Sequence, residues 1–391
     1  MNFLELQVTL SLCTVFLLRM FSVFSVFPIL SKYGICLNGS NTFLIGIAIG
    51  IYGLSQVIFQ IPFGLLSDYF DRKKVIIFGL FLVFLGNIMS ASTNSIWGLI
   101  CGRFIQGSGA ISGVSMAFLS DVIREEHRVK SISAIGISFS VSFLLSVVTS
   151  PLIVQYSNFF VLFWLCAILS LICIIVVYYF FPTVNNNLKN DNINFLCKKN
   201  IKLFMQKQFF IYYLSIFCLH FLLMMNFSIV PHQLELSGLL FFQHWKMYLN
   251  MILISFLVLF CFIFYCKNQS ILNNIVEICI FFLFVSSLLF FKSNSNLVIL
   301  ILSLQIFFIF FNLLEVFLPS NLSKNISKNS YKGSIMSIYS TSQFLGIFFG
   351  GLCSGWLYSF LSISNMFAFE AFFISIWFLL IIYYRKYYHK K

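Results

Sequence analysis

The stretch GLLSDYFDRKK, Gly64 to Lys74, separates two long apolar runs and carries five charged residues between Asp68 and Lys74. Only 9% of the 391 residues are charged and 60% are hydrophobic, so this density of charge is exceptional in the chain. In a soluble protein, about a quarter of the residues are charged. The composition therefore indicates an integral membrane protein, in which this stretch is a polar loop between two membrane-spanning segments.

Apolar runs long enough to cross a bilayer recur from one end of the chain to the other. A hydrocarbon core about 30 Å thick requires roughly 20 apolar residues in a helix. The runs lack the alternating pattern of an outer-membrane barrel, so we expect an all-α fold with twelve transmembrane helices. The predicted spans are 6–31, 43–66, 75–92, 96–120, 131–155, 159–181, 209–231, 245–266, 271–291, 296–319, 333–360 and 364–384.

The longest polar interval predicts a division of the chain into two halves. Residues 182–208 form this central loop, which separates a six-helix half at 1–181 from a second at 209–391. Two halves of this kind are typical of a secondary transporter. A loose internal repeat agrees, since the loop after the fourth span resembles the loop after the tenth.

Basic residues predict the orientation. If both termini are cytoplasmic, nineteen of the 24 Lys and Arg residues lie on the cytoplasmic side, and only Lys32, Lys246 and Lys292 lie outside. This asymmetry follows the positive-inside rule. It also explains the net charge of +13 through contact with lipid headgroups, without a nucleic-acid partner.

Other residue types argue against an enzyme or a metal protein. The eleven cysteines are scattered singly, so we expect neither a disulfide framework nor a metal site, and no cofactor. The sequence also has no HExxH, GxSxG, GxxxxGK[ST] or GxGxxG motif.

Small residues four positions apart recur in the second, fourth and eleventh spans. Examples are GIAIG at 46–50, GAISG at 109–113 and GIFFG from Gly346 to Gly350. Such spacing lets helix backbones approach closely in lipid. We expect these three spans to pack in the interior of the protein.

Ionisable side chains within spans are candidates for function because each is costly unless it is paired or hydrated. Glu315 could carry a proton or pair with a basic side chain, and His220 could titrate or be structural. Arg19 could bind an anionic substrate or stabilise the charge of a nearby acid. Glu277 and Glu370 lie near span ends, and we interpret them as snorkelling residues or drift.

The opening stretch resembles the signature of the major facilitator superfamily, with Gly64, Asp68, Arg72 and Lys73 at the signature positions. The resemblance implies the corresponding twelve-helix fold and a bacterial inner-membrane transporter that works as a monomer. It covers nearly the whole chain. The bacterial member that it resembles has a soluble domain after its twelfth helix, and we expect this domain to be missing after Lys391.

The same resemblance implies a conformational latch. Asp68 would face the N-terminus of the eleventh helix near 333–336 in the outward-open state, and Arg72 would pair with Asp121. A carboxylate at a helix N-terminus contributes about 0.3–1 kcal/mol, which can bias two states without locking either. Tyr69 replaces the usual arginine and Asp71 the usual glycine. Aspartate tolerates the positive φ of a glycine, but we expect both changes to weaken the network.

A second signature lies in the fourth span. The sequence GRFIQGSGA, with Arg103, Gln106, Gly107 and Gly109, resembles the signature of the proton-coupled antiporter branch, in which the arginine is linked to proton transfer.

The antiporter signature expected near the end of the fifth span is mostly lost. Only Pro151 is recognisable, with Ser146 and Ser150 in place of glycines, which weakens the case for drug antiport.

The sequence thus favours a transporter in the lipid bilayer that alternates access by rocking two halves. The preferred hypothesis is proton-coupled efflux of a small hydrophobic or amphiphilic molecule, with Glu315 as proton carrier and Arg19, His220 and Arg103 around the cavity. One alternative is an importer or facilitator of the same fold without proton coupling. Another is a membrane receptor that moves nothing.

Overall fold

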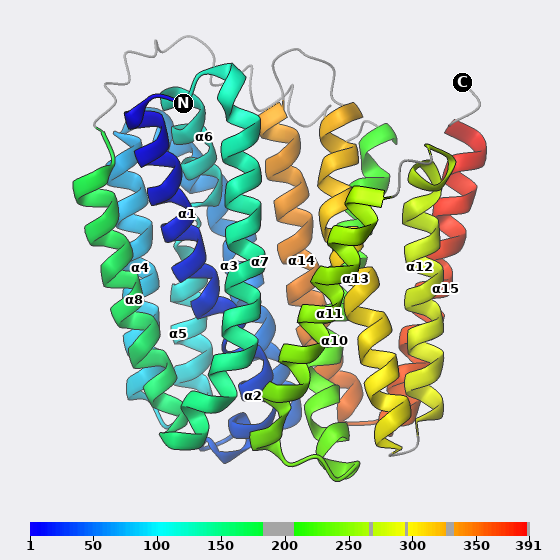
Figure 1. The fold of residues 1–391 in the computed structure, drawn as a ribbon. Coiled ribbons are helices and arrows are strands. Elements are labelled where there is room, and N and C mark those ends of the chain that lie inside the picture. Colours follow the sequence, from blue (N-terminus) through cyan, green and yellow to red (C-terminus); the bar gives the residue numbers. More distant parts are fainter. Residues whose placement is uncertain (183–206, 266–268, 294–295, 326–331, 389–391) are drawn as a thin grey trace. The chain divides into compact units, whose positions relative to one another are not determined.

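The computed structural model describes residues 1–182, 207–265, 269–293, 296–325 and 332–388 (Figure 1). Within these ranges the chain is helical, and the β-structure is limited to one isolated bridge between Asn38 and Ser95. The chain divides into two compact units, Met1–Ile193 and Asn194–Lys391. Most of the predicted central loop, 182–208, lies outside the described residues, so its limits stay a prediction.

The first unit is a bundle in which α1 packs against α7 and α8, while α4 packs against α5 and α8. Polar side chains begin two of its helices: Asn41 accepts a hydrogen bond from the Leu44 amide at 2.7 Å, and Asp71 accepts one from the Lys73 amide at 3.0 Å. Its helices are α1 (Phe3–Phe24), α2 (Phe27–Tyr33), α3 (Thr42–Tyr69), α4 (Arg72–Ser92), α5 (Ile96–Ser108), α6 (Ser112–Val122), α7 (Glu125–Tyr156) and α8 (Phe159–Phe180).

The second unit is organised around α10 and α14, which pack along each other, and around α12, which packs against α13 and α15. A 3₁₀ turn, Phe241–Gln243, precedes α11, which packs against α13. The helices of this unit are α10 (Lys207–Leu236), α11 (His244–Tyr265), α12 (Gln269–Lys292), α13 (Leu297–Asn325), α14 (Lys332–Tyr358) and α15 (Ile363–Tyr388).

In the described part of the chain, ten helical segments are long and apolar enough to cross a membrane. They correspond to ten of the twelve predicted spans. The eleventh predicted span is α14, which is also a single helix.

The fourth predicted span, 96–120, is wrong as a continuous helix, because α5 ends at Ser108 and α6 begins at Ser112. Between them the Ala110 amide donates to the Ser108 carbonyl at 2.8 Å, and the Ile111 amide donates to the Gly109 carbonyl at 2.9 Å. These tight three-residue turns replace the helical ladder. The break leaves the Gly109 carbonyl available to a side chain.

Two predicted packing glycines explain how closely α14 lies against α10. A Cβ atom added at Gly350 would lie 2.6 Å from the Phe221 carbonyl oxygen, and one at Gly346 would meet the Phe217 carbonyl oxygen. Gly107 in α5 is equally confined, by the Tyr52 carbonyl of α3. Contact between backbones at this range needs glycine.

Candidate transport site and latch

The loop after α3 joins three helices of the first unit at one end. Arg72, the first residue of α4, forms an ion pair with Asp121 near the end of α6. The two side chains are 10% and 24% exposed. Lys73 donates from Nζ to the Phe181 carbonyl at 2.7 Å, just beyond α8. The ion pair is the one that the resemblance implies.

The other half of the latch remains a prediction. The side chain of Asp68 and those of residues 332–334 lie outside the described part of the structure. Gly64 lies within α3, where an added Cβ would have nothing within 4 Å, so packing in this structure does not require glycine there.

The expected glycine-like geometry at Asp71 is wrong. Asp71 has φ of −53° and ψ of 121°, a conformation open to any residue, and its carboxylate caps α4. The substitution therefore gives α4 an N-cap, because an aspartate at this position satisfies an amide that glycine would leave free.

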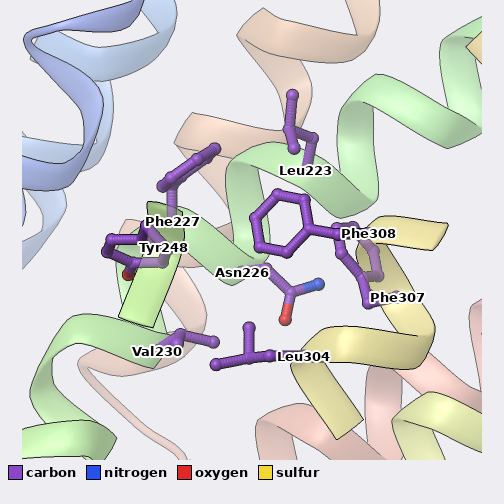
Figure 2. Close-up of a pocket in the computed structure, with 8 residues that line it drawn as sticks. All are labelled: Leu223, Asn226, Phe227, Val230, Tyr248, Leu304, Phe307 and Phe308. Atoms are coloured by element: carbon purple, nitrogen blue, oxygen red, sulfur yellow. The ribbon is translucent and has the colours of Figure 1, made fainter. Parts of the chain in front are cut away.

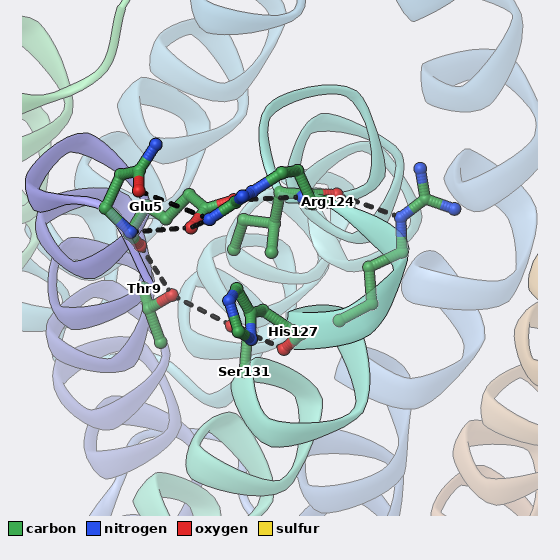
Figure 3. A network of polar contacts seen from close by, with 8 residues as sticks. Glu5, Thr9, Arg124, His127 and Ser131 are labelled. Atoms are coloured by element: carbon green, nitrogen blue, oxygen red, sulfur yellow. Dashed lines mark hydrogen bonds and ion pairs between the residues drawn. The ribbon is translucent and has the colours of Figure 1, made fainter.

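A further ion pair links the starts of α1 and α7, and the sequence analysis did not find it (Figure 3). Glu5 accepts from Arg124 Nε at 2.9 Å and from the Asn2 amide at 2.7 Å. One turn further along α1, the Thr9 and Ser131 hydroxyls lie 3.0 Å apart. Glu5 three residues after Asn2 is a capping signal, but Glu5 and Arg124 are 119 positions apart in the sequence, so their contact could not be read from it.

Arg19 lies at the break between α5 and α6. Its side chain is buried, with Nη1 donating to Ser112 Oγ at 3.0 Å and Nη2 to the Gly109 carbonyl at 3.0 Å. Nη2 also lies 3.5 Å from the hydroxyl of Tyr52 on α3. All three partners are neutral.

Arg103 is a second buried guanidinium in the first unit. Its Nη1 donates to Gln106 Oε1 at 2.7 Å, and its guanidinium lies over the rings of Tyr52 and Phe27 at 5.1 and 5.8 Å. Gln106 continues the network by donating to Ser22 Oγ at 2.8 Å. The antiporter-like residues thus connect α5 with α1 and α3.

The second unit brings Glu315 of α13, His220 of α10 and Gln343 of α14 together. Gln343 Nε2 lies 2.7 Å from His220 Nε2 and 3.4 Å from Glu315 Oε1. His220 Nε2 lies 3.8 Å from Glu315 Oε2. Gln343 was missed by the sequence analysis, although a glutamine inside an apolar span was a signal.

The hydrogen bonds assign the protonation of the His220 ring. A glutamine amide nitrogen can only donate, so His220 Nε2 accepts from Gln343 and carries no proton. The other ring nitrogen, Nδ1, then donates to the Ile216 carbonyl at 3.3 Å. His220 is therefore neutral in this arrangement, and Glu315 has no charged partner among the described residues.

The interpretation as a snorkelling or drifted residue is wrong for Glu370 and stays a prediction for Glu277. Glu277 on α12 pairs with Arg385 on α15 at 2.6 Å. Glu370 is 1% exposed and accepts a hydrogen bond from Asn226 Nδ2 at 2.6 Å. Each residue has a partner on a neighbouring helix, and that neighbour could not be read from span limits.

Asn226 also lines a small pocket in the second unit, and Figure 2 shows it among the rings of Phe227, Phe307 and Phe308. The pocket allows about 10 Å³ for the centre of a water-sized sphere, which is room for about one water molecule. It is too small for an organic substrate.

Comparison with known proteins establishes the family. The family model described as Major Facilitator Superfamily matches residues 12–328. The chain belongs to this superfamily. The inner membrane transport protein YajR of Escherichia coli (strain K12) is 39% identical over 373 residues, covering 95% of this chain and 82% of YajR. The family and YajR are transporters, so this chain is a multi-pass membrane transporter of the major facilitator type and not an enzyme.

Two further similarities agree with this assignment. An uncharacterized transporter of Buchnera aphidicola subsp. Acyrthosiphon pisum (strain APS) is 60% identical over 351 residues, 90% of each chain. The solved structure of the POT family transporter PepTSo has a TM-score of 0.78 and 11% identity, over 98% of each chain. That likeness concerns the fold alone.

Proposed function

We propose that the protein is a proton-coupled exporter of small hydrophobic or amphiphilic molecules, with Glu315 as the proton carrier. The observation that carries the proposal is the environment of this carboxyl group. Glu315 lies in an apolar helix beside a neutral histidine and a glutamine, without a lysine or arginine partner among the described residues. A carboxyl group held by neutral groups can exist in both protonation states.

His220 and Gln343 would accommodate both protonation states of Glu315. When Glu315 is protonated, Gln343 can keep its bond to His220 and the site is neutral. When Glu315 loses its proton, a negative charge develops beside two polar groups that can stabilise it. Loading and unloading the proton therefore changes the charge of the site by one unit, which is what coupling to a pH gradient requires.

The latch would set the balance between the conformations of the transport cycle. Arg72 and Asp121 hold α4 to α6, and Asp68 would complete the latch from α3. An interaction worth about 1.4 kcal/mol changes the ratio of two states about tenfold. A latch of this strength biases the cycle and leaves both states accessible.

The cellular setting is part of the proposal. We place the protein as a monomer in the bacterial inner membrane, in line with the printed name of its relative YajR. The basic residues in its loops support an orientation with both termini in the cytoplasm. A reporter that is active only in the cytoplasm, fused to the C-terminus, should be active. Activity of a periplasmic reporter at the same place would reverse the topology.

The test of transport uses purified protein in liposomes and a panel of amphiphilic dyes. Efflux predicts that a pH gradient drives dye movement against its concentration gradient and that Glu315→Gln abolishes this dependence. Glu277→Gln is the matched control, because Glu277 is a carboxyl group of the same unit that pairs with Arg385. If the parent protein exchanges dye at a rate that does not depend on the pH gradient, a facilitator is favoured over an exporter.

A further inference from the structure

The first unit holds two buried positive charges, Arg19 and Arg103, without a charged partner among its described residues. Arg19 and Arg103 are 2% and 0% exposed, and neither forms an ion pair with a described residue. The acidic residues described in this unit are Glu5, Asp71, Asp121 and Glu126, and all of them lie at or near helix ends. A buried charge without a counter-charge is costly, even where neutral groups accept its hydrogen bonds.

Of the two arginines, Arg19 has the surroundings of a binding group. Its partners are a hydroxyl, a main-chain carbonyl at a helix break, and a phenol at 3.5 Å, the limit of a hydrogen bond. Its Nε has no hydrogen-bond partner, although it is buried. Arg103 also has unpartnered buried nitrogens, Nε and Nη2, but two aromatic rings and Gln106 surround its guanidinium. We therefore assign it a contribution to the positive potential and not a direct contact.

The helix break places a second anion-binding element beside Arg19. Ser112, which accepts the Arg19 hydrogen bond, is the first residue of α6. The first amide of this helix that donates to a carbonyl one turn earlier is that of Ser115, which donates to the Ile111 carbonyl at 2.8 Å. The first three amides of α6 therefore have no carbonyl within the helix. Free amides at a helix N-terminus favour negatively charged oxygen atoms.

The turn also has room for at least a methyl-sized group at Gly113. A Cβ added at Gly113 would have only Gln60 Nε2 nearby, at 3.7 Å. The Gln60 and Gln56 side-chain oxygens are buried and have no hydrogen-bond partner. Gln56 donates from Nε2 to the Tyr52 hydroxyl at 3.1 Å, which orients the phenol beside Arg19.

We propose that Arg19, with Ser112 and the first turn of α6, binds an anionic group of the transported molecule. The substrates are then amphiphilic organic anions that carry a carboxylate or a phosphate, and a charge-assisted contact to Arg19 holds them. Arg103 raises the positive potential of the site without touching the anion. This inference rests on the proposed function only in taking the protein to be a transporter, and it needs no proton coupling.

The test compares four probes with one naphthalene ring and different head groups: naphthoate, naphthyl phosphate, naphthylmethylamine and naphthylmethanol. Binding to the full chain in detergent is measured by equilibrium dialysis at neutral pH, without any gradient. We expect at least one of the two anions to bind about tenfold tighter than the alcohol. A preference between the two anions tells a carboxylate site from a phosphate site.

Variants connect the preference to the site. Arg19→Gln should remove the preference for anions, Arg19→Lys should keep part of it, and Ser112→Ala should weaken it. Arg385→Gln is the control, because this arginine pairs with Glu277 in the other unit. Size-exclusion profiles and thermal unfolding establish that each variant is folded. If Arg19→Gln does not fold, Ser112→Ala tests the site in its place.

Three outcomes would overturn the proposal: tighter binding of the amine or the alcohol than of either anion by the parent, binding of none of the four probes, or an anion preference that survives Arg19→Gln. If the parent shows the anion preference but no pH-driven transport, proton coupling fails and the anion site stands.

Discussion

Gln343 Nε2 lies 2.7 Å from the Nε2 atom of His220, and the same amide nitrogen lies 3.4 Å from Glu315 Oε1. The three side chains come from three helices, α14, α10 and α13, of which α10 is far from the other two in the sequence. A change at Gln343 should therefore affect both His220 and Glu315.

Gln343→Leu removes the donor to His220 Nε2. The same change removes the amide nitrogen that lies 3.4 Å from Glu315 Oε1. His220 and Glu315 then each lose a polar neighbour, so the arrangement proposed to carry the proton is disrupted. We expect pH-driven dye transport in proteoliposomes to be slower than in the parent at equal protein level.

An unchanged rate of pH-driven transport in Gln343→Leu, at equal protein level, would contradict this relationship.

Asp121→Asn removes the charged partner of Arg72 and leaves a buried guanidinium, whose Nε already lacks a hydrogen bond. The pair is partly exposed, so we expect a loss of about 1–2 kcal/mol in the free energy of unfolding. The measurement is thermal unfolding in detergent. Glu126→Gln, at an exposed residue, is the control and should leave the free energy of unfolding unchanged. Equal stability of the two variants would contradict a stabilising role for the Arg72–Asp121 ion pair.

Gly350→Ala brings a methyl group to within 2.6 Å of the Phe221 carbonyl on α10. Relieving that contact requires α10 and α14 to separate, at a cost of about 1–3 kcal/mol. Gly136→Ala is the matched control, since an added Cβ there meets nothing within 4 Å. We expect the first variant to lower the unfolding temperature and the second to leave it unchanged or slightly raised; the reverse order would be incompatible with the packing.

Glu370→Gln should be tolerated and Glu370→Ala should not. Asn226 Nδ2 donates to one oxygen of the carboxyl group at 2.6 Å, and a glutamine carbonyl can accept the same bond. Alanine leaves the amide without this acceptor and opens a cavity, which together cost about 2–5 kcal/mol. Thermal unfolding of both variants measures the difference, and a loss of stability in Glu370→Gln as large as that in Glu370→Ala would mean that this hydrogen bond is not what holds the residue.

The sequence predicted the helices well because bilayer thickness demands long apolar runs, and these are visible without any structure. It predicted the fourth span as one helix because GAISG contains nothing that forbids a helix. The break at Gly109 depends on Gly79 of α4, whose carbonyl oxygen would meet an added Cβ at Gly109, and on Arg19 of α1. Both are tertiary neighbours.

The sequence predicted the charged residues of the candidate site but not its neutral ones. Arg19, Arg103, His220 and Glu315 stood out because charge within a span is rare. Tyr52, Ser112 and Gln343 are common residue types whose importance depends on what they contact. The partner of Glu370 was missed for the same reason, since 144 residues separate it from Asn226.

The most direct test of the central claim is dye transport by Glu315→Gln in proteoliposomes with and without an imposed pH gradient. Proton coupling predicts that the parent responds to the gradient, whereas the variant still exchanges dye across the membrane but no longer responds. A variant whose transport depends on the gradient as strongly as the parent's would contradict the role of Glu315 as the proton carrier.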